Sequence, residues 1–198
     1  MVERCLASGN GDLERADPIA MAVIDDRESA GLEEVSLCEA VCVGRIARVE
    51  QLPSGRFNLL LHGLCRARID ELDPPADERL HLRAWLRPIE PDFQSAPPLP
   101  EARRTIRSLL GNTRLRRLAA AGMATEWLDR DDLPTSVVLD LIGFAVVRDE
   151  AIRYRLLEQG DCRRRAETVT RELQMLDRLV AQVDLQNHAS WPKGLSWN

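Results

Sequence analysis

The stretch GRIARVEQLPSGRFNLLLHGLCRARIDEL, residues 44–72, alternates apolar residues with arginines around a Pro-Ser-Gly turn and a second glycine. Its LPSG tetrad places Pro53 and Gly55 where a type I turn favours them. The spacing therefore predicts a hairpin in which Val43–Gln51 pairs with Arg56–His62.

Apolar side chains alternate with polar ones along the second half of this stretch. Phe57, Leu59 and Leu61 are predicted to share one face, and after Gly63 the alternation resumes with Cys65, Ala67 and Ile69 on one side. Arg66 and Arg68 then point to the opposite face, an orientation that the pleat alone explains. We interpret the row of arginines first as a sheet surface and only second as a recognition surface.

Two further segments have strand character. The continuous apolar run IAMAVI, residues 19–24, is typical of a buried strand. In RLHLRAWLR, residues 79–87, a half-buried antiparallel strand is predicted. Its inward residues are Leu80, Leu82, Ala84 and Leu86, and its outward residues are Arg79, His81, Arg83, Trp85 and Arg87.

A proline-rich segment, PIEPDFQSAPPLPEA, marks a boundary near residues 88–100, and the apolar period beyond it is helical. Asp149 and Asp161 are placed to cap two helices. The last helix carries an apolar stripe of Ala166, Val169, Leu173, Leu176, Val180 and Val183. Strands precede helices in blocks, so the sequence predicts an α+β fold. We expect a β domain over 1–92, a helical bundle over 98–187 and a tail over 188–198.

Composition restricts the class of protein. The chain has 198 residues, a net charge of −5 and five cysteines. An odd number of cysteines without C-x-x-C spacing disfavours a disulfide framework, and no apolar leader opens the chain, so we expect a cytoplasmic protein with no membrane partner. The negative charge disfavours nucleic acid as a partner.

No motif for catalysis or cofactor binding is present. The chain lacks a phosphate-binding glycine loop and the nucleophile elbow of hydrolases. The histidines His62, His81 and His188 lie far apart, and Cys38 with Cys42 supplies only half of a zinc ligand set. We therefore expect neither an enzyme nor a cofactor or metal. Three arginine clusters are interpreted as solvated helix faces: Arg103, Arg104, Arg107; Arg114, Arg116, Arg117; and Arg163, Arg164, Arg165.

The opening stretch resembles the Lon protease N-terminal domain family, with which it shares a "GRI" strand, a proline-glycine-arginine turn and a "GxxRxRI" strand. The matching residues are Gly44, Arg45 and Ile46, then Pro53, Gly55, Arg56, Phe57 and Asn58, then Gly63, Arg66, Arg68 and Ile69. The segments DLIGFAVV and LLEQGDCRRRAETV are also similar to that family, and the likeness extends to about Val183.

The resemblance implies a PUA-like antiparallel β pseudobarrel followed by a helical bundle, and a role in recognising protein substrates. The ATPase and protease domains of the full-length enzyme have no counterpart in this chain. The implied binding surface consists of Gly44, Arg45, Gly55, Arg56, Phe57, Gly63, Arg66 and Arg68. The family's first strand and the start of its first helix have no counterpart either, so we expect an unpaired sheet edge.

The leading hypothesis is a non-catalytic module that binds apolar segments of unfolded proteins, through the β part and the cleft between it and the helices. A separate ATPase or protease is a partner class that fits this role. One alternative is an RNA-binding PUA-like protein that contacts phosphates through Arg56, Arg66 and Arg68. Another is an enzyme whose site the sequence does not reveal.

Overall fold

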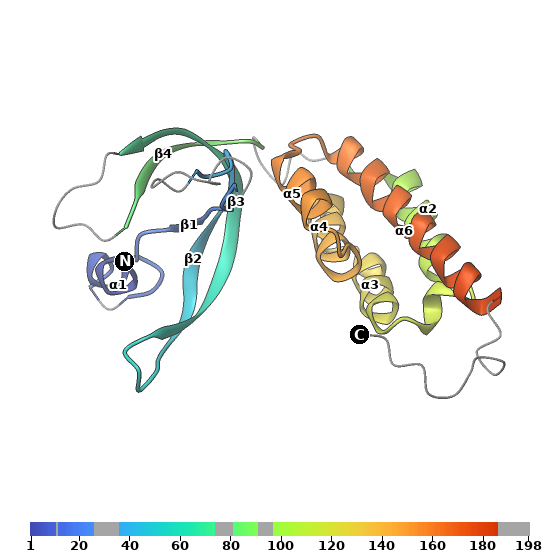
Figure 1. The fold of residues 1–198 in the computed structure, drawn as a ribbon, viewed down its shortest axis with the longest axis horizontal. Coiled ribbons are helices and arrows are strands. Elements are labelled where there is room, and N and C mark those ends of the chain that lie inside the picture. Colours follow the sequence, from blue (N-terminus) through green and yellow to red (C-terminus); the bar gives the residue numbers. More distant parts are fainter. Residues whose placement is uncertain (11, 26–35, 74–80, 91–96, 186–198) are drawn as a thin grey trace. The chain divides into compact units, whose positions relative to one another are not determined.

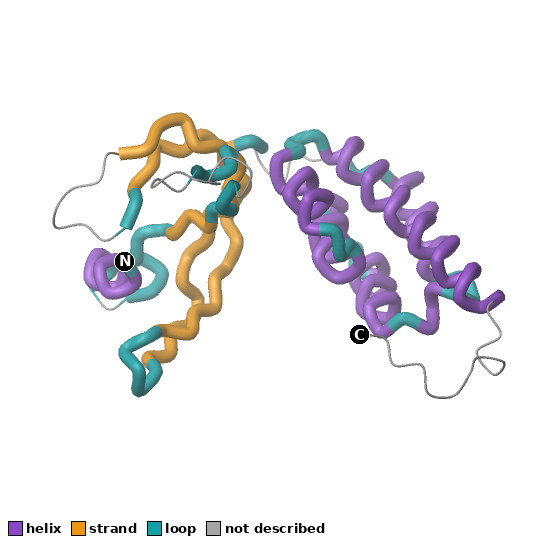
Figure 2. Tube along the Cα trace, viewed as in Figure 1, coloured by secondary structure: helices purple, strands orange, loops and turns teal. Residues whose placement is uncertain are grey.

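The structure is a computed structural model and describes residues 1–10, 12–25, 36–73, 81–90 and 97–185. Two compact units make up the chain: residues 1–92 with 157–160, called here the β unit, and residues 93–156 with 161–198, called the helical unit. Figure 2 shows that strands belong to the first unit and that most helices belong to the second. Arg79, Leu80, His188 and the tail from residue 188 lie outside the described residues.

The β unit contains a four-stranded antiparallel sheet and one short helix (Figure 1). In chain order these elements are α1 (Val2–Ser8), β1 (Ile19–Met21), β2 (Ala40–Gln51), β3 (Phe57–Asp73) and β4 (Arg83–Pro88). The strands are ordered β1-β2-β3-β4, so each strand pairs with its neighbours in the chain. Since helices follow this sheet in the second unit, the predicted α+β class is confirmed.

The predicted hairpin is formed by β2 and β3. Gly55 N donates to Leu52 O at 2.9 Å, Leu52 N donates to Arg56 O at 2.8 Å, and Gly55 has a φ of +76°. A tight turn followed by a left-handed residue is a common hairpin connection, and glycine adopts that conformation without steric cost.

One expectation about the hairpin is wrong, because β3 does not break at Gly63. Gly44 lies opposite Gly63, whereas Val43 pairs with Cys65, so Leu64 is an extra residue in a bulge. A bulge lets one strand continue through an irregular position. The strand segment expected after Gly63 is therefore the second half of β3.

The inner face of the sheet carries Cys65, Ala67 and Ile69, the residues predicted to share one side after Gly63. Val41, Val43 and Ala67 form a buried cluster, against which Cys65, Ile69 and Leu86 pack. In β4, Ala84 and Leu86 are half-buried and Trp85 is exposed, which confirms the alternation there. Leu82 does not follow it, because this side chain is half-exposed and precedes the strand.

The apolar run at residues 19–24 is not a buried strand. β1 covers only Ile19–Met21, and of these residues only Ile19 is buried, whereas Met21 and Ile24 are 54% and 53% exposed. The position of β1 at the edge of the sheet explains the difference, because one of its sides has no neighbouring strand among the described residues.

The helical unit consists of five α-helices and a 3₁₀ turn within its described residues. They are α2 (Pro100–Leu110), η2 (Leu115–Arg117), α3 (Ala119–Asp129), α4 (Thr135–Val146), α5 (Glu150–Glu158) and α6 (Cys162–Leu185). Both predicted caps are confirmed: Ile152 N donates to Asp149 Oδ1 at 3.0 Å, and Arg163 N donates to Asp161 Oδ1 at 2.8 Å.

The apolar stripe of α6 is buried along the first part of the helix. Val169 and Leu173 lie in the core of the helical unit, and Leu176 packs against it as a partly buried residue. Val183 is half-exposed, so the predicted stripe is wrong near the end of the helix. Among the described residues no helix combines the length and the apolar character needed to cross a bilayer.

The arginine clusters are not simply solvated faces. Arg103 donates four hydrogen bonds, to the carbonyl oxygens of Leu128, Arg130 and Leu133 and to the hydroxyl of Thr135. Arg165 is only 1% exposed and lies 3.6 Å from Asp140. These arginines connect helices, because a guanidinium group can reach several acceptors at once.

Candidate functional site

Two glycines of the family motif, Gly44 and Gly55, shape the hairpin. An added Cβ at Gly44 would lie 3.1 Å from His62 O, a tight contact to which β3 would have to adjust by a few tenths of an ångström. Gly55 occupies the left-handed turn position, and Gly63 stands opposite Gly44 beside the bulge. Phe57 starts β3, and Arg56 precedes it as an exposed residue of the turn.

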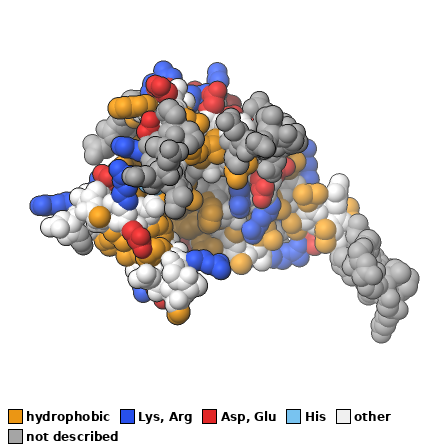
Figure 3. All heavy atoms as spheres, turned by 60° about the vertical axis from the view of Figure 1, so that its left-hand side comes forward, with side chains coloured by type: hydrophobic (Ala, Val, Ile, Leu, Met, Phe, Trp, Pro, Cys, Tyr) orange, Lys and Arg blue, Asp and Glu red, His pale blue; other side chains and the backbone are white. Residues whose placement is uncertain are grey.

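The sheet arginines are engaged by carboxylates. Arg66 Nη1 donates to both oxygens of Glu90, and Arg68 Nη1 donates to Glu39 Oε2 at 2.7 Å. Arg87 pairs with Asp70 at 2.9 Å. Arg45 is half-buried, and its Nε has no hydrogen-bond partner among the described residues. On the face that Figure 3 shows, basic side chains are interspersed with carboxylates and hydrophobic side chains.

A cavity of about 420 Å³ lies within the β unit. Side chains from all four strands line it, including Ile19, Val41, Val43, Ile69 and Leu86. The eight residues of the binding surface that the family resemblance implies are all absent from its lining residues. The concave side of the sheet, and not the row of arginines, therefore provides the enclosed space of this unit.

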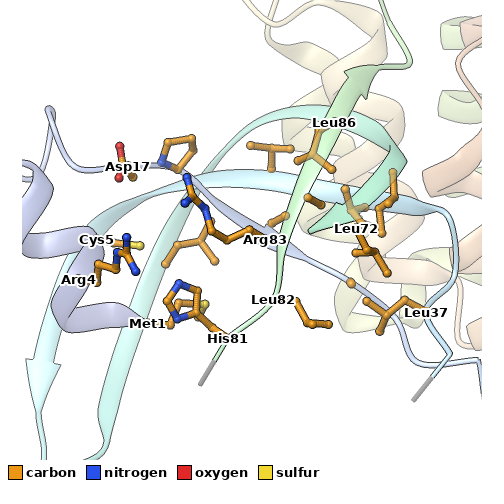
Figure 4. A pocket seen from close by; sticks show the side chains of 18 residues that line it. Met1, Arg4, Cys5, Asp17, Leu37, Leu72, His81, Leu82, Arg83 and Leu86 are labelled. Atoms are coloured by element: carbon orange, nitrogen blue, oxygen red, sulfur yellow. The ribbon is translucent and has the colours of Figure 1, made fainter. Parts of the chain in front are cut away.

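The two ends of this cavity differ in polarity (Figure 4). Leu37, Leu72, Leu82 and Leu86 gather at one end, and Arg4, Cys5, Asp17, His81 and Arg83 gather at the other. Leu72 and Leu82 are 42% and 50% exposed, so a ligand can reach the apolar end. The cavity suits a ligand that has an apolar body and a charged group.

The polar end depends on how α1 is held. Ser8 Oγ donates to Cys5 O at 2.7 Å and accepts from Asp17 N at 3.0 Å, which ties the helix to the segment before β1. Gly9 is required between them, because an added Cβ would lie 2.2 Å from Asp12 O. These contacts fix the backbone that carries Arg4, Cys5 and Asp17.

The thiol of Cys5 is not activated. Burial raises its pKa above the ordinary value, and the negative charge of Asp17 raises it further, against the opposing effect of Arg4. A thiol with a raised pKa stays protonated near neutral pH and is a weak nucleophile. In the described part of the chain, no three His, Cys, Asp or Glu residues are grouped so that they could hold a metal ion.

The helical unit has a second, larger groove of about 660 Å³, between the prolines before α2 and one face of α6. Its α6 wall presents Arg163, Glu167 and Arg171, whose charges alternate at four-residue spacing and partly neutralise one another. With Glu101 also in the lining, the two positive and two negative charges of this groove balance.

Residues 1–175 match the family model of the ATP-dependent protease La (LON) substrate-binding domain. The chain belongs to this family. Two solved structures share the fold of the Lon substrate-binding domain seen in this chain. The N-terminal domain of the Mycobacterium avium complex Lon protease is 18% identical, with a TM-score of 0.53 over 80% of this chain and 90% of that one. A Lon N-terminal domain protein from Xanthomonas campestris is 20% identical, with a TM-score of 0.50 over 81% and 88%. Among curated proteins no match was found.

The sequence resemblance to the Lon family is thus confirmed, but sequence patterns did not reveal the cavity of this Lon domain. His81 and Arg83 alternate with apolar residues, and alternation alone assigns them to the outer face. Both line the cavity, as do Arg4 and Asp17, which belong to no motif. The sequence pattern does indicate the inward-facing residues of β2, β3 and β4. These residues identify the wall of the cavity but not its charged end.

Proposed function

We propose that this Lon substrate-binding domain binds apolar segments of polypeptides, such as unfolded proteins expose, through the cavity of the β unit, and that it catalyses no reaction on them. The observation that carries the proposal is the reachable apolar end of the cavity, formed by Leu37, Leu72, Leu82 and Leu86. Burying apolar side chains of a ligand there is favourable by about 25 cal/mol for each Å² of apolar surface removed from water.

The proposal also covers the type of sheet, the location of the protein, its partner and its domain bounds. We regard the curved sheet as the PUA-like pseudobarrel of the family, in a cytoplasmic protein whose separate ATPase or protease partner receives the bound polypeptide. Residues 1–92 and 98–187 are proposed as its two domains. Gly44 and Gly55 contribute through the backbone, by shaping the hairpin that carries β2 and β3.

RNA binding has less support from the structure. Of the three arginines that would contact phosphates, Arg66 and Arg68 already bond to Glu90 and Glu39. An RNA phosphate would have to displace a carboxylate at each of these positions. Arg56 is exposed and forms no such ion pair within the described part of the chain, and one exposed arginine is an ordinary surface feature.

The test measures binding of a fluorescent, permanently unfolded polypeptide to variants of the apolar end. Leu72→Asp and Leu82→Asp each place a charge where apolar groups must be buried, so affinity falls at least about tenfold. Leu60→Asp is the matched control, because Leu60 is exposed on β3 but does not line the cavity.

Equal affinity of all three variants and the unchanged protein would show that the cavity is not the binding site. Salt distinguishes the RNA alternative, because affinity for RNA falls steeply with the logarithm of salt concentration and burial of apolar groups does not.

A further inference from the structure

The cavity of the β unit is bordered by both edge strands of the sheet. Ile19 and Ala20 of β1 and Arg83, Ala84 and Leu86 of β4 line it, although β1 and β4 stand at opposite ends of the strand order. The sheet therefore curves until its two edges border one space, as the ribbon in Figure 1 shows for β1 and β4. Edge strands present backbone N–H and C=O groups that another strand can pair with.

The two edges are not equally suited to pairing. β4 carries Arg83, Arg87 and Pro88, and charged residues and proline on an edge oppose the addition of a strand. β1 has the sequence IAM, without charge or proline, and Met21 is more than half exposed. Among the described residues β1 pairs only with β2. The β1 edge is therefore the one that accepts an additional strand.

The charged end of the cavity also restricts which ligands fit. Arg4 and Arg83 bring two positive charges to this end, against the single negative charge of Asp17 (Figure 4). Both arginines are exposed, so their guanidinium groups can be reached from solvent. A carboxylate that accepts hydrogen bonds from guanidinium groups makes a stronger contact than a neutral acceptor does.

We propose that this cavity binds its polypeptide as an extended strand added to the β1 edge, with alternate apolar side chains at the leucine end and an acidic side chain of the same segment at Arg4 and Arg83. This inference rests on the proposed function and specifies the class of segment. Alternation follows from strand geometry, because successive side chains point to opposite faces. The preferred sequence is a short run of alternating apolar and polar residues next to Asp or Glu.

The experiment uses the full chain and labelled synthetic peptides with alternating apolar residues, read by fluorescence anisotropy. Three of these peptides differ at a single position, directly next to one end of the apolar run, where they carry Glu, Gln or Lys. We expect the Glu peptide to bind about tenfold more tightly than the Gln peptide, the value for one charge-assisted hydrogen bond. Arg83→Glu together with Arg4→Glu reverses the order, so that the Lys peptide binds best. Arg87→Glu is the control, because Arg87 lies on the same strand but pairs with Asp70 and does not line the cavity.

Two further peptides, N-methylated at alternate residues in the two possible registers, test the backbone contact. Methylation on the edge-facing amides lowers affinity at least about tenfold, whereas methylation one residue along does not, since only alternate amides face the neighbouring strand. Equal binding of Glu and Lys peptides overturns the acidic requirement, and indifference to N-methylation overturns strand addition, while the proposed function survives either result. Absence of binding by every peptide and by the unfolded polypeptide overturns both proposals.

Discussion

Arg66 Nη1 lies 3.2 Å from Glu90 Oε1, and the two side chains are only 11% and 10% exposed. Arg66 also accepts, through its backbone oxygen, a hydrogen bond from Ile89 N at 3.0 Å. The pair therefore joins the middle of β3 to the chain that follows β4. A charge buried this far is costly without its partner, so the two residues depend on each other.

Replacing Arg66 by Ala leaves the Glu90 carboxylate buried without this partner. We expect the free energy of unfolding of the β unit to fall by about 3 kcal/mol or more. Arg68→Ala is the comparison, because Arg68 and Glu39 are largely exposed and such pairs contribute less than about 1 kcal/mol. Urea unfolding followed by circular dichroism measures both, and similar losses for the two variants would contradict this account of the buried pair.

Leu173→Ala removes a fully buried side chain from the core of the helical unit. The expected cost is about 2–5 kcal/mol, from lost burial and the cavity that remains. Leu176 is only partly buried, so its replacement costs less. Leu179→Ala, on the exposed side of α6, is expected to change stability by less than about 0.5 kcal/mol. If the thermal midpoints of Leu173→Ala and Leu179→Ala were equal, Leu173 would not be a core residue of the helical unit.

Arg103→Lys tests whether the planar guanidinium is needed at the end of α3. Lysine keeps the charge but cannot reach the same four acceptors, so most of the stability lost in Arg103→Ala remains lost. Arg104→Ala is the neighbouring control, since Arg104 is exposed and pairs only with Glu101 among the described residues. Full recovery of the thermal midpoint in Arg103→Lys would show that charge alone suffices.

The contact between Arg114 and Asp177 makes the stability of the helical unit depend on pH in the acidic range. The hydrogen bonds from Arg114 hold the pKa of the Asp177 carboxyl below its ordinary value. A carboxyl with a lower pKa in the folded state stabilises it above the unfolded pKa, and this stabilisation is lost as pH falls through the folded pKa. Asp177→Asn should therefore be less stable than the unchanged protein near pH 7, and the difference should shrink in acid. Asp131→Asn serves as the exposed control, and a difference that stays constant down to about pH 2 would refute the linkage.

Local signals were sufficient for the hairpin and for the helix caps. Pro53 and Gly55 determine a turn within four residues, and Asp149 and Asp161 bond to amides two or three residues away. The periodicity of α6 was equally reliable where the helix packs on its neighbours, with Val169 and Leu173 buried and Leu176 and Val180 partly buried.

Contacts between residues that lie far apart in the sequence determine the features that the sequence could not predict. The run at residues 19–24 resembles a buried strand, but its burial depends on where β1 stands in the sheet. Arginine is ordinarily a surface residue, and the burial of Arg165 goes with the position of Asp140 on another helix, which the sequence does not reveal. The charged end of the cavity likewise combines Arg4, Asp17 and Arg83 from three separate segments.

Residues 157–160 belong to the β unit although the chain on both sides of them belongs to the helical unit. Within the β unit, an added Cβ at Gly160 would lie 2.8 Å from Ile89 Cγ2, so this short segment fits closely against the chain that follows β4. The backbone consequently passes from one unit to the other three times, and a single cut between residues 92 and 98 yields no clean halves. In the exchange of domains between relatives, whether by recombination or by design, residues 157–160 have to travel with the distant first part of the sequence.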